Sequence, residues 1–176
     1  KARNIIVLSA LYIGTGELET RLIQDLEDAL EREKNLKVTL IFDFNRAHRL
    51  YEPNNDDIKL PQFYALLPLL KKFGRERVTL RLYEMPPTNA VKRHMPPELR
   101  EALGVYHVKF CMMDNTVILT GANLSKEYFE SRQDRYILIQ DERMTSFIEA
   151  FTSSFSKWCY IVNYDGGLYP PESSHE

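Results

Sequence analysis

The sequence predicts an α/β fold in which helices flank a mixed β-sheet. Two observations lead to this class. Short apolar runs rich in β-branched residues alternate along the chain with segments of helical periodicity. The composition, 44% hydrophobic and 27% charged, is that of a folded globular protein. A chain of 176 residues also has the length of one domain.

The first half of the chain contains three predicted strands and two predicted helices. Residues 4–11 form an unbroken apolar run, which is typical of a strand buried on both faces. Residues 17–34 place leucines at helical spacing between charged residues, as an amphipathic helix does. Strands are predicted at 36–44 and 78–83, and a helix at 62–73 lies between them.

The second half predicts a hairpin, a strand and a closing helix. The hairpin covers 106–113 and 116–119, with its turn at Asp114 and Asn115. A strand follows at 136–140 and a helix at 142–158. The predicted apolar face of that helix contains Met144, Phe147, Ile148, Phe151 and Phe155. We expect a single domain over 1–162 and a Gly-, Pro- and Ser-rich tail over 163–176 that leads toward a second half.

Charge and cysteine content argue against several classes of function, although they leave a local basic pocket open. The chain has 23 Lys and Arg against 25 Asp and Glu, a net charge of −2, whereas a general nucleic-acid binder is clearly basic. We therefore expect no nucleic-acid partner. Cys111 and Cys159 are too few for a disulfide scaffold and lack metal-ligand spacing. We expect neither a metal site nor a cofactor.

One segment has the residue types for phosphodiester chemistry. His107 and Lys109 are two apart on a predicted strand, so both side chains leave the same face. Asp114 lies at the turn and Asn123 follows the returning strand. A hairpin brings its two ends together, so an imidazole, an ammonium and an amide are expected to converge.

Each group in this set has a chemical role. The imidazole of His107 can attack phosphorus and form a covalent intermediate, which divides one difficult displacement into two easier ones. Lys109 and Asn123 can hold the non-bridging phosphate oxygens. Asp114 is expected to orient a histidine or a neighbouring group.

The pattern His107-x-Lys109-x4-Asp114 resembles the HKD motif of the phospholipase D superfamily. Within that superfamily, residues 9–19, 40–46, 114–125 and 128–136 resemble the phosphatidylglycerophosphate synthase family. The segments Tyr-Ile-Gly-Thr-Gly from Tyr12 and Arg-Gln-Asp-Arg-Tyr from Arg132 are the most specific to that family. The chain departs from many superfamily members at 120–123, where Thr-Gly-Ala-Asn lacks the serine of a Gly-Ser pair.

The resemblance implies a fold, a reaction and a location. It implies one phospholipase D-like HKD domain that makes phosphatidylglycerophosphate and CMP from CDP-diacylglycerol and glycerol 3-phosphate, in the cardiolipin pathway. His107 is implied as the nucleophile of a phosphatidyl-histidine intermediate, with Lys109 and Asp114 beside it. It also implies peripheral association with the mitochondrial inner membrane.

The superfamily's active site needs two HKD motifs, and this chain has one. His48, His94 and His175 have no lysine two residues later. Either a second copy of the chain completes the site, or a second motif follows in the same native chain. Synthases of this family have both motifs on one chain, so the resemblance favours the second arrangement.

Several residues outside the motif are candidates for substrate binding. Arg46 and Arg49 follow a predicted strand and have the geometry to grip the phosphate of glycerol 3-phosphate, although loop arginines in solvent would look the same. Backbone N–H groups in the turn of Tyr12, Gly14 and Thr15 are a candidate phosphate cradle, with an ordinary strand-to-helix turn as the alternative.

Two further arginines and one loop remain open between function and structure. Arg132 and Arg135 are candidates for substrate contact, whereas an ion pair between Asp134 and an arginine is the structural alternative. Residues 85–103 mix apolar and basic side chains, which suits either contact with an anionic membrane surface or an ordinary proline-rich loop.

Three competing functions share the same motif. The first is a homodimeric phosphodiesterase or nuclease with one HKD motif per chain, against which the near-neutral charge argues. The second is another CDP-diacylglycerol-dependent transferase, of the serine or cardiolipin synthase type. The third is an inactive HKD domain that serves as a binding module.

Overall fold

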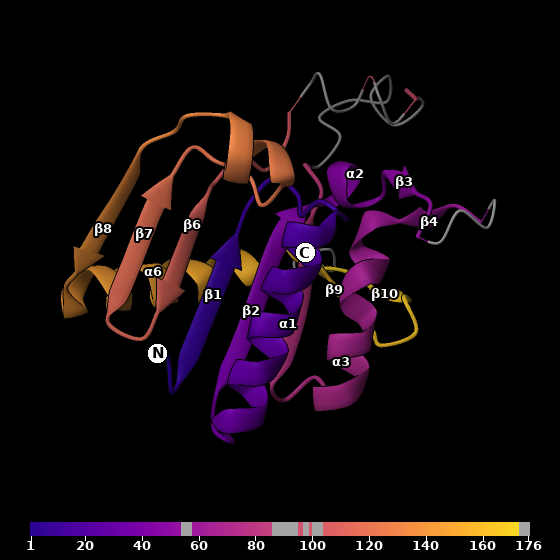
Figure 1. Ribbon diagram of the computed structural model, residues 1–176. Coiled ribbons are helices and arrows are strands. Elements are labelled where there is room, and N and C mark those ends of the chain that lie inside the picture. The colour runs from indigo at the N-terminus through magenta and orange to yellow at the C-terminus, as the bar shows by residue number, and fades with distance from the viewer. Residues whose placement is uncertain (54–57, 86–94, 97–98, 100–103, 173–176) are drawn as a thin grey trace.

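The computed structural model describes residues 1–53, 58–85, 95–96, 99 and 104–172. Its main feature is an eight-stranded sheet in the order β10-β9-β5-β2-β1-β6-β7-β8 (Figure 1). The central strands β1 (Ile5–Ser9), β2 (Lys37–Asp43) and β5 (Val78–Tyr83) are parallel to one another. The flanking strands are antiparallel, so the sheet is mixed, as predicted.

The flanking strands extend the sheet on both sides. On one side are β6 (Phe110–Met113), β7 (Thr116–Thr120) and β8 (Tyr136–Gln140). On the other side are β9 (Cys159–Val162) and β10 (Leu168–Tyr169). A separate two-stranded ribbon is made of β3 (Leu50–Tyr51) and β4 (Leu60–Pro61).

Helices cover both faces of the sheet, which confirms the predicted fold class. On one face lie α1 (Glu17–Arg32) and α3 (Leu67–Phe73), and on the other lies α6 (Glu142–Ser156) (Figure 1). Short helical segments are α2 (Phe44–Ala47), the 3-10 helix η1 (Gln62–Leu66) and the π-helix η2 (Glu127–Ser131). Among the described residues, no helix is both long and apolar enough to cross a membrane.

Alternation along the strands divides the core into two layers. Ile6 and Leu8 pack in the large cluster beneath α1 and α3, whereas Val7 packs with Ile148 of α6. Met144, Phe151 and Phe155 of α6 also pack inward, as predicted. Phe147 does not, since it is 65% exposed. Its position lies off the stripe at 144, 148, 151 and 155 that faces the sheet, so the prediction for Phe147 was wrong.

Three predicted boundaries need correction. The helix predicted at 62–73 begins as η1 and becomes α3 only at Leu67, because Pro68 lacks the N–H group that a continuing helix would use. The first strand of the hairpin begins at Phe110, because Tyr106 and Val108 bond to Asp43 and Ser9 instead of to the partner strand. The predicted tail adds β10 to the sheet, where Leu168 pairs with Val162.

The predicted membrane-contact loop at 85–103 lies mostly outside the described residues. Met85 and Leu99, which belong to it and are described, are exposed.

Asp114 fastens the β6–β7 turn to the start of β1. Its carboxylate accepts hydrogen bonds from the backbone N–H groups of Arg3 (2.7 Å), Asn4 (3.0 Å) and Ile5 (3.0 Å). Asp114 itself has a φ of 47°, a left-handed conformation that aspartate tolerates in tight turns. This turn lies at the opposite end of the hairpin from His107, because Phe110 begins β6 and Met113 ends it. The expected role of Asp114 in orienting a histidine is therefore corrected to a structural one.

We predict that Asp114→Ala destabilises the fold by roughly 1–2 kcal/mol, because the exposed N–H groups of Arg3 and Asn4 can bond to water once the carboxylate is removed. Burial alone would raise the pKa of Asp114, but the three backbone N–H donors hold it below the usual value. The stabilisation is therefore present above the usual carboxyl pKa of about 4 and is lost as pH falls through the lowered value. Urea unfolding at several pH values measures this.

The matched control is Asn115→Ala, which changes the exposed neighbour in the same turn. Equal stability of Asp114→Ala and the wild type at neutral pH would contradict the structural role.

Candidate active site

The candidate site lies where the parallel strands end. Ser9 at the end of β1 pairs with Phe110, so the chain just before β6 reaches the same edge of the sheet. Strand β7 returns to this edge, because Phe110 also pairs with Leu119. The segments that contain His107, Lys109 and Asn123 therefore meet beyond the carboxyl ends of the strands, the usual place for ligands in α/β folds.

A chain of buried hydrogen bonds fixes the backbone around His107. Asp43, at the end of β2, accepts a hydrogen bond from the backbone N–H of Tyr106 at 2.8 Å. The hydroxyl of Ser9 donates to the carbonyl of Val108 at 2.7 Å and accepts from the hydroxyl of Tyr106 at 2.7 Å. Burial raises the pKa of Tyr106 to about 12, so its hydroxyl remains a donor. Both neighbours of His107 are thus tied to the sheet, while its own side chain is exposed.

The surroundings of His107 favour a neutral imidazole. Its pKa is lowered, first by partial burial and then by the positive charges of Lys109 and Arg46. A neutral ring has a free lone pair at neutral pH. This is the form that attacks phosphorus.

Lys109 is held close to His107 in a buried position. Its side chain is 7% exposed, and its ammonium donates to the backbone carbonyl of His107 at 3.3 Å. Burial lowers the pKa of Lys109, and the charge of Asp134 opposes that effect. The carboxylate of Asp134 in turn accepts from the backbone N–H of Gly121 at 3.2 Å. A Cβ at position 121 would lie 2.7 Å from that carboxylate, so a larger residue there would displace the Asp134 side chain.

Asn123 contributes a buried polar group to the same edge. The residue is 4% exposed, and among the described residues its Oδ1 atom has no hydrogen-bond partner. Buried amide oxygens rarely lack a partner, and such a group is more common where a ligand binds. The neighbouring Leu124 is bonded through its carbonyl to the N–H of Gly14 at 2.8 Å.

Arg46 completes the positively charged side of the site. It lies in α2, whose first turn is capped by the carboxylate of Asp43 through the Arg46 N–H at 2.9 Å. The guanidinium lies 5.7 Å from the centre of the Tyr12 ring, and the Tyr12 hydroxyl is 3.4 Å from that of Ser125. Arg49 lies just beyond α2 and is exposed.

The structure does not bring every predicted binding residue to this site. The N–H of Gly14 already bonds to Leu124, so it does not serve as a phosphate cradle, and Thr15 lies partly exposed in the same turn. Arg132 bonds to the Tyr128 hydroxyl at 3.1 Å and to Glu127 at 3.1 Å within the η2 turn. These local partners explain the position of Arg132 without a substrate.

Arg135 is exposed, and its backbone N–H donates to Asp134 at 2.7 Å. Asp134 thus bonds to backbone groups and its charge acts on Lys109, and within the described part of the chain it forms no ion pair with an arginine, the alternative considered from the sequence.

Sequence reasoning missed Glu19, which joins three segments near the site. Glu19 is 2% exposed, and its Oε1 accepts from the backbone N–H of Lys126 at 2.5 Å. A Cβ at Gly14 would lie 2.4 Å from that same oxygen. An acidic residue in the first turn of a helix usually faces solvent. The signal in the sequence is the pair of glycines just before the helix, Gly14 and Gly16, which leave room for the Glu19 carboxylate against the backbone.

Neither cysteine is poised for chemistry. Burial raises the pKa of Cys111 to about 11 and that of Cys159 to about 12, so both remain protonated thiols at neutral pH. Both are free. Within the described residues, no group of three His, Cys, Asp or Glu side chains is arranged to hold a metal ion.

Comparison with known proteins identifies the family. A family model described as "Cardiolipin synthase, PLD-like domain" matches residues 1–158. The chain belongs to this phospholipase D-like (PLD-like) domain family. A solved structure, the phosphatidylserine synthase of Haemophilus influenzae, superposes on this PLD-like domain with a TM-score of 0.69 at 20% identity. The match covers 99% of this chain and 37% of that one, and it supports the fold alone.

Curated relatives of the PLD-like domain share one activity in their names. The chain is 40% identical over 147 residues to the human mitochondrial CDP-diacylglycerol–glycerol-3-phosphate 3-phosphatidyltransferase, covering 80% of this chain and 25% of the human protein. It is 36% identical over 174 residues to the Saccharomyces cerevisiae enzyme of that name, covering 95% of this chain and 31% of the yeast protein. The chain thus spans a quarter to a third of the length of these relatives.

We predict that Arg46→Gln raises the pKa of His107, because it removes one of the two positive charges that disfavour the imidazolium. An NMR titration of the His107 ring measures this directly. Activity that requires the neutral ring should then begin at higher pH, since the acidic limb of the pH profile follows that pKa.

The matched control is Arg49→Gln, which removes an exposed arginine three residues away. An unchanged or lowered His107 pKa in Arg46→Gln would contradict the electrostatic account.

Proposed function

We propose that this chain is the nucleophile-bearing HKD domain of a phosphatidyltransferase that makes phosphatidylglycerophosphate and CMP from CDP-diacylglycerol and glycerol 3-phosphate. The observation that carries the proposal is the 40% identity, over 80% of the chain, to a curated enzyme with that name. The clustering of His107, Lys109, Asn123 and Arg46 at one edge of the sheet supports phosphoryl chemistry at this end. The proposed product lies in the cardiolipin pathway.

In the first step, a ring nitrogen of His107 attacks the phosphorus that bears the diacylglycerol. The new P–N bond forms as the bond between that phosphorus and the CMP oxygen breaks. Lys109 and Asn123 hold the non-bridging oxygens, and an ammonium in a buried position stabilises their negative charge more strongly than it would in water. CMP leaves with a proton from a general acid.

In the second step, a hydroxyl of glycerol 3-phosphate attacks the same phosphorus. The P–O bond to glycerol forms, the P–N bond breaks, and the imidazole is released. The group that protonated CMP accepts the hydroxyl proton. Arg46, whose positive charge lowers the pKa of His107, is the candidate to bind the phosphate of glycerol 3-phosphate. Arg49 and the ring of Tyr12 are secondary candidates for that contact.

We further propose that a second HKD motif supplies the acid and base. It lies in the same native chain, because the relatives are three to four times as long as the matched segment, and a homodimer mate is the alternative. The lipid substrate requires the protein to meet a membrane surface. The human relative is named as mitochondrial, so we place the enzyme peripherally on the mitochondrial inner membrane.

An assay of the full-length protein tests this reaction. We expect CMP release from CDP-diacylglycerol to require glycerol 3-phosphate, and His107→Ala to reduce kcat by about 10³-fold or more, as loss of a nucleophile does. His48→Gln is the matched control, because His48 bonds to the backbone of Phe44 and packs against Phe63 instead. With acyl-labelled CDP-diacylglycerol alone, label should remain on the denatured wild type and be absent from His107→Ala.

Two results together would overturn the lipid assignment. They are no CMP release in this assay, and cleavage of a phosphodiester or of single-stranded DNA by a dimer of the protein. Undiminished transfer by His107→Ala would overturn the role of the nucleophile while leaving the reaction in place.

A further inference from the structure

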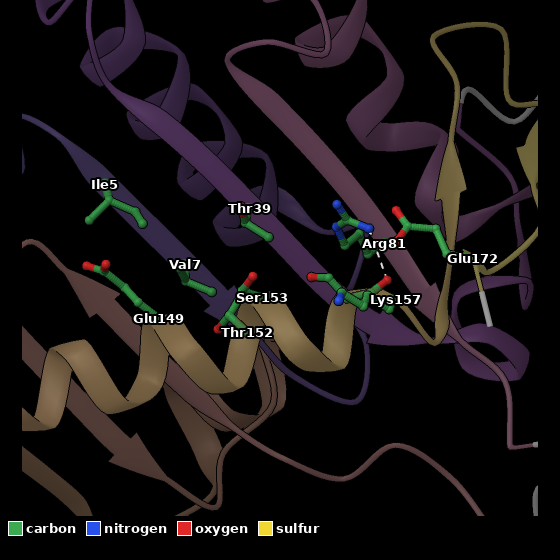
Figure 2. A pocket seen from close by; sticks show the side chains of 10 residues that line it. Ile5, Val7, Thr39, Arg81, Glu149, Thr152, Ser153, Lys157 and Glu172 are labelled. Carbon is green, nitrogen blue, oxygen red and sulfur yellow. Dashed lines mark hydrogen bonds between the residues drawn. The ribbon is translucent and has the colours of Figure 1, made fainter.

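A polar cavity lies on the opposite side of the sheet from α1. It has a volume of 420 Å³ and lies between the sheet and α6 (Figure 2). Its apolar end is formed by Ile5 and Val7 of β1, beside Glu149. None of its lining residues belongs to the His107 site. Its size is within the range of small-molecule sites.

The cavity exists because polar side chains replace core residues on both of its walls. Thr39 pairs in register with Val7, and Arg81 pairs with Ile41, so both side chains leave the sheet on the α6 side. The face of α6 opposite them contributes Thr152 and Ser153, not large apolar groups. Thr39 and Arg81 therefore extend into a space that no apolar side chain fills (Figure 2).

One buried hydroxyl at this cavity has no partner. Thr152 is 7% exposed, and among the described residues its Oγ1 atom makes no hydrogen bond. A threonine in a helix usually bonds back to its own backbone or to solvent, so an unpaired one on a cavity wall indicates a ligand contact.

The opposite end of the cavity is positively charged. The guanidinium of Arg81 donates to the carbonyl of Ser156 at 3.0 Å, which uses one of its five N–H groups. Lys157 lies beside it, and Glu172 lies nearby (Figure 2). Burial lowers the pKa of Arg81, and the negative charge of Glu172 opposes this effect. An anion at this end would therefore stabilise the buried guanidinium.

We propose that this cavity binds a small organic phosphate. Its phosphate lies between Arg81 and Lys157, and the hydroxyls of Thr39, Thr152 and Ser153 donate to the remaining oxygens. Its organic part lies toward Ile5 and Val7. A planar guanidinium with several hydroxyl donors matches the three terminal oxygens of a phosphate monoester better than the two oxygens of a carboxylate. The binding is separate from the chemistry of His107.

Isothermal titration calorimetry of the full-length protein tests the proposal, with CMP, glycerol 3-phosphate and inorganic phosphate as probes. All titrations use the His107→Ala, Lys109→Ala background, which weakens binding at the candidate active site. We expect at least one organic phosphate to bind, and Arg81→Gln to weaken its affinity about tenfold or more. Thr152→Val, which keeps the shape of the side chain, should weaken it severalfold.

Hydrogen–deuterium exchange locates the site. The phosphate that binds should protect residues 37–43 and 149–157 in the background protein but not in its Arg81→Gln derivative. The matched control is Arg143→Gln, an exposed arginine on the same helix but outside the cavity lining, which should bind as the background protein does.

Three outcomes would overturn the proposal. Absence of binding by all three probes excludes an organic phosphate site of useful affinity. Binding that survives both Arg81→Gln and Thr152→Val places the ligand elsewhere. Succinate serves as a carboxylate probe in a further titration. An affinity for succinate equal to that for the organic phosphate would show that the cavity recognises carboxylates instead. Loss of transferase activity in the wild type would bear on the proposed function alone, because these titrations require no catalysis.

Glu172 supplies a second readout. Because its carboxylate lies near Arg81, it competes with a bound phosphate for the same charge. Glu172→Gln should therefore increase affinity for the phosphate probe severalfold, and a decrease would contradict the proposed position of the anion.

Discussion

The carboxylate of Asp43 is the contact on which the candidate active site depends. It is buried at the end of β2 and bonds to the N–H of Arg46 in the next segment and of Tyr106, 63 residues further along the chain. One group thus places both the arginine that lowers the pKa of His107 and the backbone that presents the imidazole. A buried carboxylate is costly unless it is fully hydrogen-bonded, so two N–H donors also make this position tolerable.

The remaining geometry follows from the order of the strands. Because β6 is antiparallel to β1, its first residue pairs with the last residue of β1, and the His107 segment meets the loop after β1. Ser9 then bonds to the residues on both sides of His107, Tyr106 and Val108. The imidazole is therefore held by its backbone while its side chain remains exposed. This arrangement suits a nucleophile that must approach and then release a phosphorus atom.

The sequence predicted most strands, the principal helices and the convergence of the HKD segment with Asn123, because these depend on local periodicity and on the register of one hairpin. It did not predict contacts that arise from tertiary packing. Asp114 is the third residue of the HKD motif, from which a role near His107 was expected. Its position in the turn instead puts it at the far end of β6, where it bonds to backbone N–H groups at the start of β1. Glu19 shows the same limit, since its burial depends on glycines and a loop more than 100 residues away.

Electrostatics also explains why a single HKD motif is insufficient for the proposed transfer. His107 is tuned toward the neutral form, which suits attack but not proton donation to CMP. A second imidazole in the same kind of environment would begin equally neutral. Under the proposed function, the diphosphate of CDP-diacylglycerol would resolve this symmetry, because its negative charge would raise the pKa of the imidazole that does not attack. In the proposed reaction, binding of CDP-diacylglycerol would thus create the acid, and once CMP had departed with the proton the same ring would be ready to act as the base.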